Sequence, residues 1–375
     1  MLPRVLFISK AVSPPFHDGT KCLVRDVASH LERVRPVVLT AKGHDSSALP
    51  DSVQRAEVYS NTGAFTPRLS DNLRAAAWVL LRSRVELWHF VFAPNPRTSR
   101  VGRLLKQARR ARVIQTVASP PRSFAGIGPL LFGDGIVVQS RWTKQRIESA
   151  CRDEGRPPPR LEVIPPPVPQ IAPRDPRAVS ALLRELAIDA ERPFFVYPGD
   201  LETSRGAETV ASVAEELARE LPEATVVFAC RNKTARSPEV AAALERRLVG
   251  KRVRFASELK DVLLLLTAAT AVLFPVDDLC GKVDLPIVLL EAMALGVPVV
   301  ALDQGPLADL DGAIKLPSLD VSSWVAQALS LARQPNLRSS AAAAGRAAVE
   351  RCFRADRVAR SYESLYLDLL RRPNS

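Results

Sequence analysis

A single carboxylate lies in the middle of an otherwise apolar stretch, KVDLPIVLLEAMALGVPVVALD, which begins at Lys282. Pro286 suits the first turn of a helix, where its missing N–H costs nothing, and Gly296 suits the residue just beyond a helix end. The pattern therefore predicts a helix from Pro286 to Gly296 with Glu291 on its second turn. A carboxylate among apolar residues is costly to bury without hydrogen-bond donors. Two neighbouring sugar hydroxyls would supply such donors to Glu291.

The start of this helix predicts an anion site. A helix N-terminus presents N–H groups and a partial positive charge, which together favour phosphate. Asp284, two residues before Pro286, lies at a plausible N-cap. The stretch thus combines a possible phosphate site with a carboxylate suited to hydroxyl groups.

Both halves of the chain alternate apolar strand-like runs with helical patterns, which indicates parallel α/β layers. The runs are apolar throughout, as in strands buried on both faces of a doubly wound sheet. Strands are expected at 4–9, 35–40, 85–92, 112–117 and 135–140, with a short strand at 161–164 that ends the first domain, and again at 194–199, 224–230, 252–257, 270–275 and 297–302. The expected fold class is therefore α/β, with two doubly wound Rossmann-like domains.

A proline-rich segment, GRPPPRLEVIPPPVPQIAPRDP, separates the two halves. Proline lacks a backbone N–H and suits neither helix interiors nor central strands. The expected organisation is an N-terminal Rossmann-like domain over 1–165, a linker over 166–176, a C-terminal Rossmann-like domain over 177–355, and a C-terminal helix over 356–375 that could pack back on the first domain. Because such sheets bind ligands at the carboxyl ends of their strands, one shared site in an interdomain cleft is expected.

Composition indicates a soluble globular protein of the cytoplasm. Hydrophobic residues make up 47% and charged residues 25% of the 375 residues, close to the averages for soluble folds. The five cysteines form no C-x-x-C pair or zinc spacing, which favours a reducing compartment. The N-terminal apolar run is too short for a secretory signal, and no apolar stretch reaches the roughly 18 residues of a spanning helix.

Positive charge is concentrated in the first half of the chain. Residues 1–170 contain 26 Lys and Arg against 13 Asp and Glu, whereas residues 171–375 contain 26 against 27. The expected helix at 98–111 combines arginines with an apolar stripe, which suits peripheral contact with an anionic membrane surface on its inner, cytoplasmic face. A solvated helix would look similar. Nucleic-acid binding has only this charge in its favour, because no nucleic-acid motif is present.

The stretch LPIVLLEAMALGVPVVA resembles the donor-site motif of the retaining GT-B glycosyltransferases of family four, the group 1 glycosyl transferases. YPGDLETSRGAETV, at 197–210, resembles the strand, turn and helix with which that family binds a diphosphate, and SPPFHDGTKCLVRDVA, at 13–28, resembles its first loop. The resemblance implies the GT-B architecture and sugar transfer from a nucleotide-sugar donor with retention of configuration. The implied acceptor is an envelope polysaccharide, a glycolipid or a metabolite.

The family motif assigns roles to two carboxylates. Its second glutamate binds the nucleotide ribose and corresponds to Glu291. Its first glutamate falls at Val283, so the neighbouring Asp284 is expected to contact the transferred sugar. Asp284 and Glu291 are accordingly the expected catalytic residues.

The resemblance also implies a set of donor-binding residues. The family's lysine position holds Arg205, whose guanidinium can bind phosphate bidentately, although a cation at a helix start opposes the helix dipole unless an anion is bound. The family's arginine position holds Asp200, which would repel phosphate. The further expected donor-binding residues, which offer positive charge, an N–H group or close backbone approach, are Gly19, Arg231, Lys233, Lys282, Leu285 and Ile287.

On the acceptor side, the expected residues are His17 and Lys21 in the first loop. His89, near the end of a strand, could reach the acceptor or be a buried structural histidine. In a retaining enzyme of this kind the leaving phosphate takes the proton of the acceptor. The resemblance therefore implies no dedicated protein base, no cofactor and no required metal.

One other function remains open, and a second is disfavoured. Val283, Asp200 and Pro286 depart from the family pattern, which is compatible with a catalytically degenerate GT-B protein that binds a nucleotide or a partner without turnover. A nicotinamide oxidoreductase is disfavoured, because neither ISKAVSPP nor YPGDLETSRG contains the G-x-G-x-x-G fingerprint.

Overall fold

The computed structural model describes residues 2–14, 16, 18–43, 48–60, 68–82, 84–232, 234–256, 259–279 and 282–372. Their contacts divide the chain into two compact units. Unit 1 comprises Met1–Pro169, Cys280–Pro286 and Cys352–Ser375, and unit 2 comprises Gln170–Leu279 and Ile287–Arg351. The sequence predicts an unbroken C-terminal domain over 177–355, whereas the structure assigns a short internal piece of that range to unit 1.

The elements of unit 1 are β1 (Arg4–Ile8), α1 (Gly19–Ser29), β2 (Arg35–Ala41), β3 (Gln54–Tyr59), α2 (Leu69–Arg82), β4 (Leu87–Phe92), α3 (Pro96–Arg109), β5 (Arg112–Val117), the 3-10 helix η1 (Gly128–Leu130), β6 (Gly135–Val138), α4 (Arg141–Asp153), β7 (Leu161–Val163) and α12 (Ala355–Arg371). Those of unit 2 are α5 (Pro176–Glu185), β8 (Phe194–Tyr197), α6 (Gly206–Glu220), β9 (Thr225–Phe228), α7 (Ser237–Arg247), β10 (Val253–Phe255), α8 (Val262–Thr267), β11 (Ala271–Phe274), α9 (Ile287–Leu295), β12 (Val299–Leu302), the 3-10 helix η2 (Gly305–Asp309), β13 (Ile314–Leu316), α10 (Val321–Arg333) and α11 (Pro335–Ala348). A π-helical turn, η3 (Val349–Phe353), follows α11.

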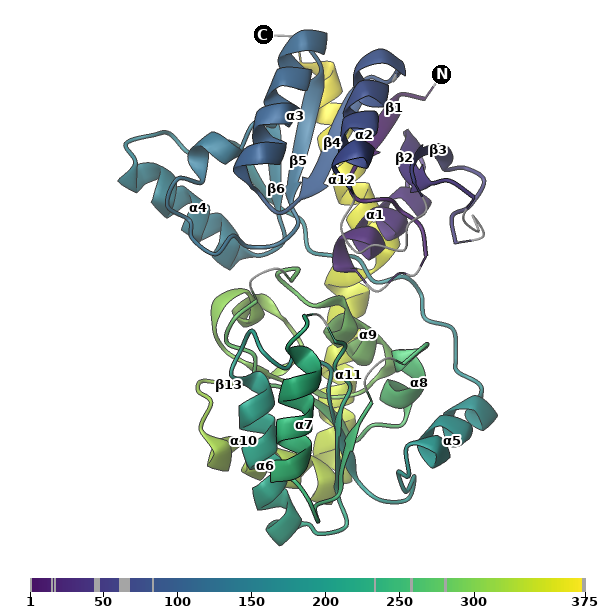
Figure 1. Ribbon diagram of the computed structural model, residues 1–375, viewed down its shortest axis with the longest axis vertical. Helices are drawn as coiled ribbons and strands as arrows, with labels where there is room; N and C mark the ends of the chain where they lie inside the picture. Colours follow the sequence, from purple (N-terminus) through teal and green to yellow (C-terminus); the bar gives the residue numbers. More distant parts are fainter. Residues whose placement is uncertain are drawn as a thin grey trace. The chain divides into compact units, whose positions relative to one another are not determined.

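Unit 1 is built on a parallel sheet with the strand order β3-β2-β1-β4-β5-β6-β7 (Figure 1). Helices cover both faces of this sheet. In β1, Val5 and Phe7 pack with α1 and α12, whereas Leu6 points to the opposite face and packs with α2. Burial on both faces explains the unbroken apolar runs of the sequence and confirms the expected doubly wound α/β class.

Unit 2 contains a second parallel sheet, with the strand order β10-β9-β8-β11-β12-β13. From β8 the chain runs through α6 to β9 on one side, and from β11 it runs through α9 to β12 on the other side. The strand order therefore reverses between β8 and β11, as it does between β1 and β4 in unit 1. Loops at the carboxyl ends of such a strand pair form the usual ligand-binding crevice of a doubly wound sheet.

Two edge strands, β3 and β13, are not predicted by the sequence. β3 reads QRAEVY, and polar residues interrupt its buried positions. β13 has only three residues, none of them fully buried. An edge strand has one neighbour instead of two, so its apolar pattern is shorter and weaker than that of a central strand.

The C-terminal helix α12 is held on the sheet of unit 1 by a buried polar and aromatic cluster. The hydroxyl of Tyr366 is 2.8 Å from Nδ1 of His89, and Nε2 of His89 is 2.7 Å from the hydroxyl of Thr116. Rings of Phe7 and Tyr362 lie 4.9 Å and 5.3 Å from the His89 ring. Complete burial lowers the pKa of His89 to about 3, so the imidazole is neutral at pH 7.

His89→Gln is expected to make folding less sensitive to acid. A histidine in the unfolded chain titrates near pH 6.5, well above the folded-state pKa of His89, which is about 3. Between these two values the unfolded chain binds the extra proton, so the free energy of unfolding falls as the pH falls, by up to about 1.4 kcal/mol per pH unit from this group. Urea unfolding of both proteins at several pH values between 6.5 and 4.5 checks the expectation. Equal losses in the two proteins would contradict it.

Candidate active site

Helix α9 forms as predicted and presents Glu291 at the surface of unit 2. The helix ends at Gly296, whose φ of 79° is left-handed, and a side chain there would collide with the guanidinium of Arg346. Leu290 and Ala292, the neighbours of Glu291, are fully buried, whereas Glu291 itself is partly exposed. Glu291 thus lies between buried apolar neighbours in the sequence, whereas its own side chain is partly exposed.

An ion pair lies at the point where the strand order of unit 2 reverses. Arg205 follows β8 and directly precedes α6, and Asp277 follows β11. The Nε of Arg205 donates to Asp277 Oδ2 at 2.7 Å, and the backbone N–H of Arg205 donates to Asp277 Oδ1 at 3.0 Å. Burial raises the pKa of Asp277, but the hydrogen bonds from Arg205 outweigh this effect and hold it below its ordinary value. Asp277 was not predicted as a member of the site.

The Asp200 carboxylate is engaged by donors of its own loop. It is almost fully buried, and its Oδ1 accepts hydrogen bonds from the backbone N–H groups of Glu202, Thr203 and Ser204. The Ser204 hydroxyl donates to Oδ2 at 3.3 Å. The expectation is therefore corrected: Asp200 shapes the loop before α6, and its charge is compensated by these donors.

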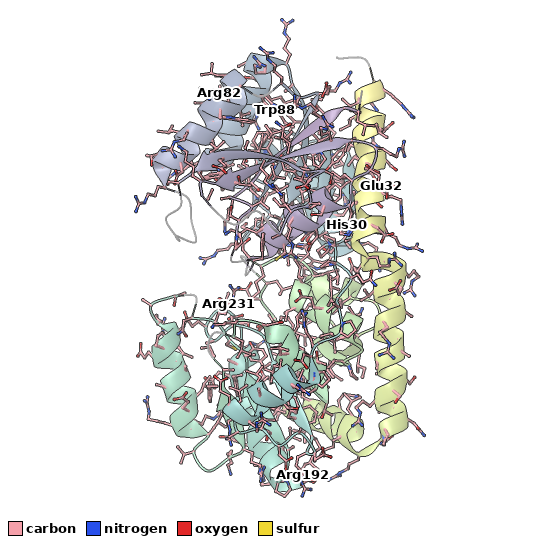
Figure 2. The ribbon with its side chains drawn as sticks, turned by 90° about the vertical axis from the view of Figure 1, so that its right-hand side faces the viewer. His30, Glu32, Arg82, Trp88, Arg192 and Arg231 are labelled. Atoms are coloured by element: carbon pink, nitrogen blue, oxygen red, sulfur yellow. The ribbon has the colours of Figure 1, made fainter. Side chains whose placement is uncertain are left out.

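Arg231 lies at the same edge of the unit 2 sheet as Arg205. It follows β9, the strand next to β8, so both residues stand beyond the carboxyl ends of neighbouring parallel strands. Figure 2 shows Arg231 at the opposite end of unit 2 from Arg192, which precedes β8. Arg231 is partly exposed. Lys233, another expected cation, lies outside the described residues.

The expected role of Asp284 is corrected by its burial in unit 1. Asp284 has no exposed surface, and its Oδ2 accepts a hydrogen bond from the Ser140 hydroxyl at 2.6 Å. Its backbone N–H donates to Gln139 Oε1 at 3.3 Å. Asp284 therefore neither caps α9, which starts at Ile287, nor offers its carboxylate to a sugar. Ser140 is at the same time the N-cap of α4, where it accepts from the N–H of Thr143 at 3.0 Å.

Gly19 packs against the residue that replaces the first glutamate of the family motif. A Cβ added to Gly19 would lie 2.9 Å from Cγ1 of Val283. The absence of a side chain therefore allows this close approach, whether or not a donor also touches Gly19. The adjoining Lys282 is partly exposed, and the side chains of Leu285 and Ile287 are buried.

The residues expected on the acceptor side differ in their position and exposure. His17 lies outside the described residues. Lys21 is half-buried on α1; its Nζ donates to the carbonyl of Ser13 at 3.1 Å, and burial lowers the pKa of its ammonium. His89 has no exposed surface and contacts α12, so of its two interpretations the structure agrees with the buried structural histidine and not with the acceptor contact.

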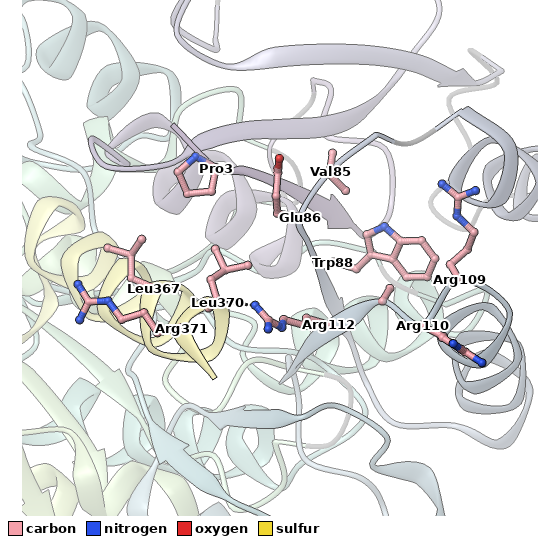
Figure 3. Close-up of a pocket in the computed structure, with 11 residues that line it drawn as sticks. Pro3, Val85, Glu86, Trp88, Arg109, Arg110, Arg112, Leu367, Leu370 and Arg371 are labelled. Atoms are coloured by element: carbon pink, nitrogen blue, oxygen red, sulfur yellow. Dashed lines mark hydrogen bonds between the residues drawn. The ribbon is translucent and has the colours of Figure 1, made fainter. Parts of the chain in front are cut away.

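None of these residues lines the cavity of about 550 Å³ in unit 1 (Figure 3). Pro3, Glu86 and Ala111, which directly precede β1, β4 and β5, contribute to its walls. The cavity is therefore at the amino ends of the strands, whereas doubly wound sheets bind substrates at the carboxyl ends. Arg112 in its wall donates hydrogen bonds to the carbonyls of Leu370 and Arg372, which caps the end of α12.

Among the residues that the structure describes, no group of three or more His, Cys, Asp or Glu side chains could hold a metal ion.

Ser140→Gly is expected to destabilise the protein by about 1.5–3 kcal/mol, because it removes a hydrogen bond to the buried Asp284 carboxylate. Glycine is a tolerable N-cap, so loss of the cap itself costs only a few tenths of a kcal/mol. Asn95→Gly is the matched control, because Asn95 caps α3 by accepting from the N–H of Thr98. Denaturant unfolding compares the three proteins, and equal costs for the two variants would contradict a stabilising contact with Asp284.

Comparisons with known proteins are consistent with this geometry. Residues 192–334 match the family model for glycosyl transferases of group 1. A search of curated proteins gives no match.

Similar solved structures cover nearly the whole chain. Anabaena HepE in complex with UDP-glucose is 14% identical with a TM-score of 0.71, and the match covers 98% of this chain and 100% of that chain. Sucrose-phosphate synthase from Thermosynechococcus elongatus is 16% identical with a TM-score of 0.72, covering 98% and 99%. A glycosyltransferase from Rickettsia africae is 15% identical with a TM-score of 0.73, covering 99% and 100%. At identities this low, the structural similarity establishes the fold alone. That fold is GT-B, with two Rossmann-like domains.

Proposed function

We propose that this glycosyltransferase, whose residues 192–334 match the family model for glycosyl transferases of group 1, takes its sugar from a nucleotide-sugar donor that binds to unit 2. The observation that carries this proposal is the cationic start of α6 at the reversal of strand order between β8 and β11. The solved structure of HepE, which has the same fold, contains UDP-glucose.

We assign the donor contacts by chemistry. The guanidinium of Arg205, whose side chain is 74% exposed, would bind the diphosphate, and Arg231 would add positive charge at the same edge. Glu291 would accept hydrogen bonds from the ribose hydroxyls. The N–H groups of Leu285 and Ile287 would bind phosphate oxygens at the start of α9, where the helix dipole favours an anion.

The proposed transfer retains the configuration of the sugar. The leaving phosphate takes the proton of the attacking hydroxyl, while arginines stabilise the charge that develops on the phosphate. This chemistry needs no protein base and no resident cofactor. The acceptor would be an envelope polysaccharide, a glycolipid or a metabolite bound by unit 1, with Lys21 as the described candidate contact.

Release of nucleoside diphosphate from a panel of nucleotide sugars tests the function. Protein that neither binds nor cleaves any member of the panel would overturn the proposed function.

Glu291→Gln is expected to weaken nucleoside diphosphate binding about 10-fold to 150-fold, because hydrogen bonds to a charged group contribute about 1.5–3 kcal/mol. Glu185→Gln, an exposed glutamate on α5, is the matched control and should bind like the parent protein. If calorimetry shows that Glu291→Gln binds the nucleoside diphosphate with unchanged affinity, the proposed contact between Glu291 and the ribose is refuted.

We further propose that the protein is cytoplasmic and binds peripherally to the inner face of the membrane through α2 and α3. No helix among the described residues is long and apolar enough to cross a membrane. Exposed apolar side chains on these two neighbouring helices are Leu69, Leu73, Leu81, Val101 and Leu104. Exposed arginines on the same helices include Arg82, Arg97 and Arg100. This combination suits an anionic lipid surface.

Co-sedimentation with lipid vesicles checks the membrane contact. The protein should bind phosphatidylglycerol vesicles more tightly than phosphatidylcholine vesicles, and Leu104→Asp should weaken that binding. Val249→Asp changes a similarly exposed apolar residue of unit 2 and should have little effect. Equal effects of the two substitutions would contradict a surface on α2 and α3.

A further inference from the structure

The N–H groups of the loop that leads into α6, and those of Arg205 and Gly206, already have acceptors within unit 2. Asp200 accepts from three successive residues, Glu202, Thr203 and Ser204. Asp277 accepts from the N–H of Arg205. The next N–H, that of Gly206, donates to the Ser204 hydroxyl at 3.2 Å. A phosphate that binds to the N–H of Arg205 or to those of the preceding loop must therefore replace one of these acceptors.

Two carboxylates thus occupy the place where the helix dipole would favour a phosphate. α6 has no side-chain cap of its own, because its N-cap residue is Arg205. A carboxylate and a phosphate oxygen present the same kind of acceptor to an N–H group and to a guanidinium. Asp200 and Asp277 therefore act at this helix start as anions supplied by the protein itself.

The two carboxylates differ in how easily a ligand could replace them. Asp200 is 3% exposed and has four donors, so its removal would leave several N–H groups of the loop without acceptors. The side chain of Asp277 is 19% exposed, and its two bonds from Arg205 come from a residue whose side chain is 74% exposed. An ion pair of this exposure contributes little to stability. Asp277 is therefore the acceptor that a diphosphate can displace.

We propose that Asp277 is a built-in competitor of the donor diphosphate: it holds Arg205 and the start of α6 in the unliganded protein and is displaced when a diphosphate binds. The inference rests on the proposed function and adds a control on donor affinity. Bound diphosphate takes over the guanidinium of Arg205, and Asp277 turns away as its charge is repelled by the phosphate. Donor affinity then depends on how much more strongly the Arg205 guanidinium binds the diphosphate than it binds the Asp277 carboxylate.

Calorimetry with inorganic pyrophosphate as the probe tests the proposal. Asp277→Asn removes the competing charge but keeps the shape of the side chain, so we expect it to bind pyrophosphate at least threefold more tightly than the parent protein. The affinity for an uncharged nucleoside should not change. Arg205→Ala should lose most pyrophosphate binding.

Glu208→Gln is the matched control for a general electrostatic effect. It removes the same charge from the first turn of α6, where Glu208 pairs with Arg247 at 2.7 Å instead of with Arg205. Its effect on pyrophosphate affinity should be much smaller than that of Asp277→Asn. An equal gain in the two variants would overturn direct competition in favour of long-range charge.

The remaining outcomes separate failure of this inference from failure of the proposed function. If Asp277→Asn binds pyrophosphate equally well or less well while Arg205→Ala loses binding, Asp277 does not compete and the competition is refuted, but the phosphate contact stands. If Arg205→Ala binds pyrophosphate like the parent protein, the phosphate contact itself is refuted, and the competition is refuted with it. Thermal unfolding gives an independent readout, since pyrophosphate should raise the midpoint of Asp277→Asn more than that of the parent.

Discussion

The start of helix α6 needs a negative charge, and much of the arrangement around it follows from that need. The helix begins at the carboxyl edge of the unit 2 sheet, next to the reversal of strand order, and its N-cap position is occupied by a cation. A cation there is unfavourable because the dipole already places partial positive charge at a helix start. Asp200 and Asp277 offset this with carboxylates from two different loops. The charge that stabilises the free protein also marks where an anionic ligand fits.

In unit 1, negative charge is likewise supplied to helix starts at the carboxyl edge of the sheet. Asp18 caps α1 by accepting from the N–H groups of Thr20 and Lys21, and it pairs with Lys10 at 2.9 Å. At α4 the N-cap is Ser140, which in turn donates to the Asp284 carboxylate. Carboxylates thus lie at helix starts in both units, as direct caps or as partners of one.

The donor-site motif is divided between the two units, and its departures from the family pattern have structural partners. The residues up to Pro286 belong to unit 1, and those from Ile287 belong to unit 2. Within unit 1, Val283 packs against Gly19, and Asp284 bonds to Ser140. The substituted positions therefore contribute packing and a buried hydrogen bond, while Glu291 keeps a partly exposed carboxylate.

The sequence predicts most central strands of both sheets, because residues buried on both faces leave unbroken apolar runs. It also places helix α9, its end at Gly296 and the accessible Glu291, since local signals determine a helix start and a left-handed helix end. Local patterns carry no information on which distant residue accepts a hydrogen bond. The hydrogen bonds of Asp284 with Ser140 and of His89 with Tyr366 were therefore not predictable. The pairing of Asp277 with Arg205 depends in the same way on strand order.

A crystal structure of the protein with the nucleoside diphosphate of its donor tests the central claim most directly, namely that unit 2 binds a diphosphate at the start of α6. The account predicts a phosphate oxygen on the guanidinium of Arg205, the ribose hydroxyls on Glu291, and Asp277 no longer bonded to Arg205. A nucleotide bound elsewhere, with the bond between Arg205 and Asp277 intact, would contradict it.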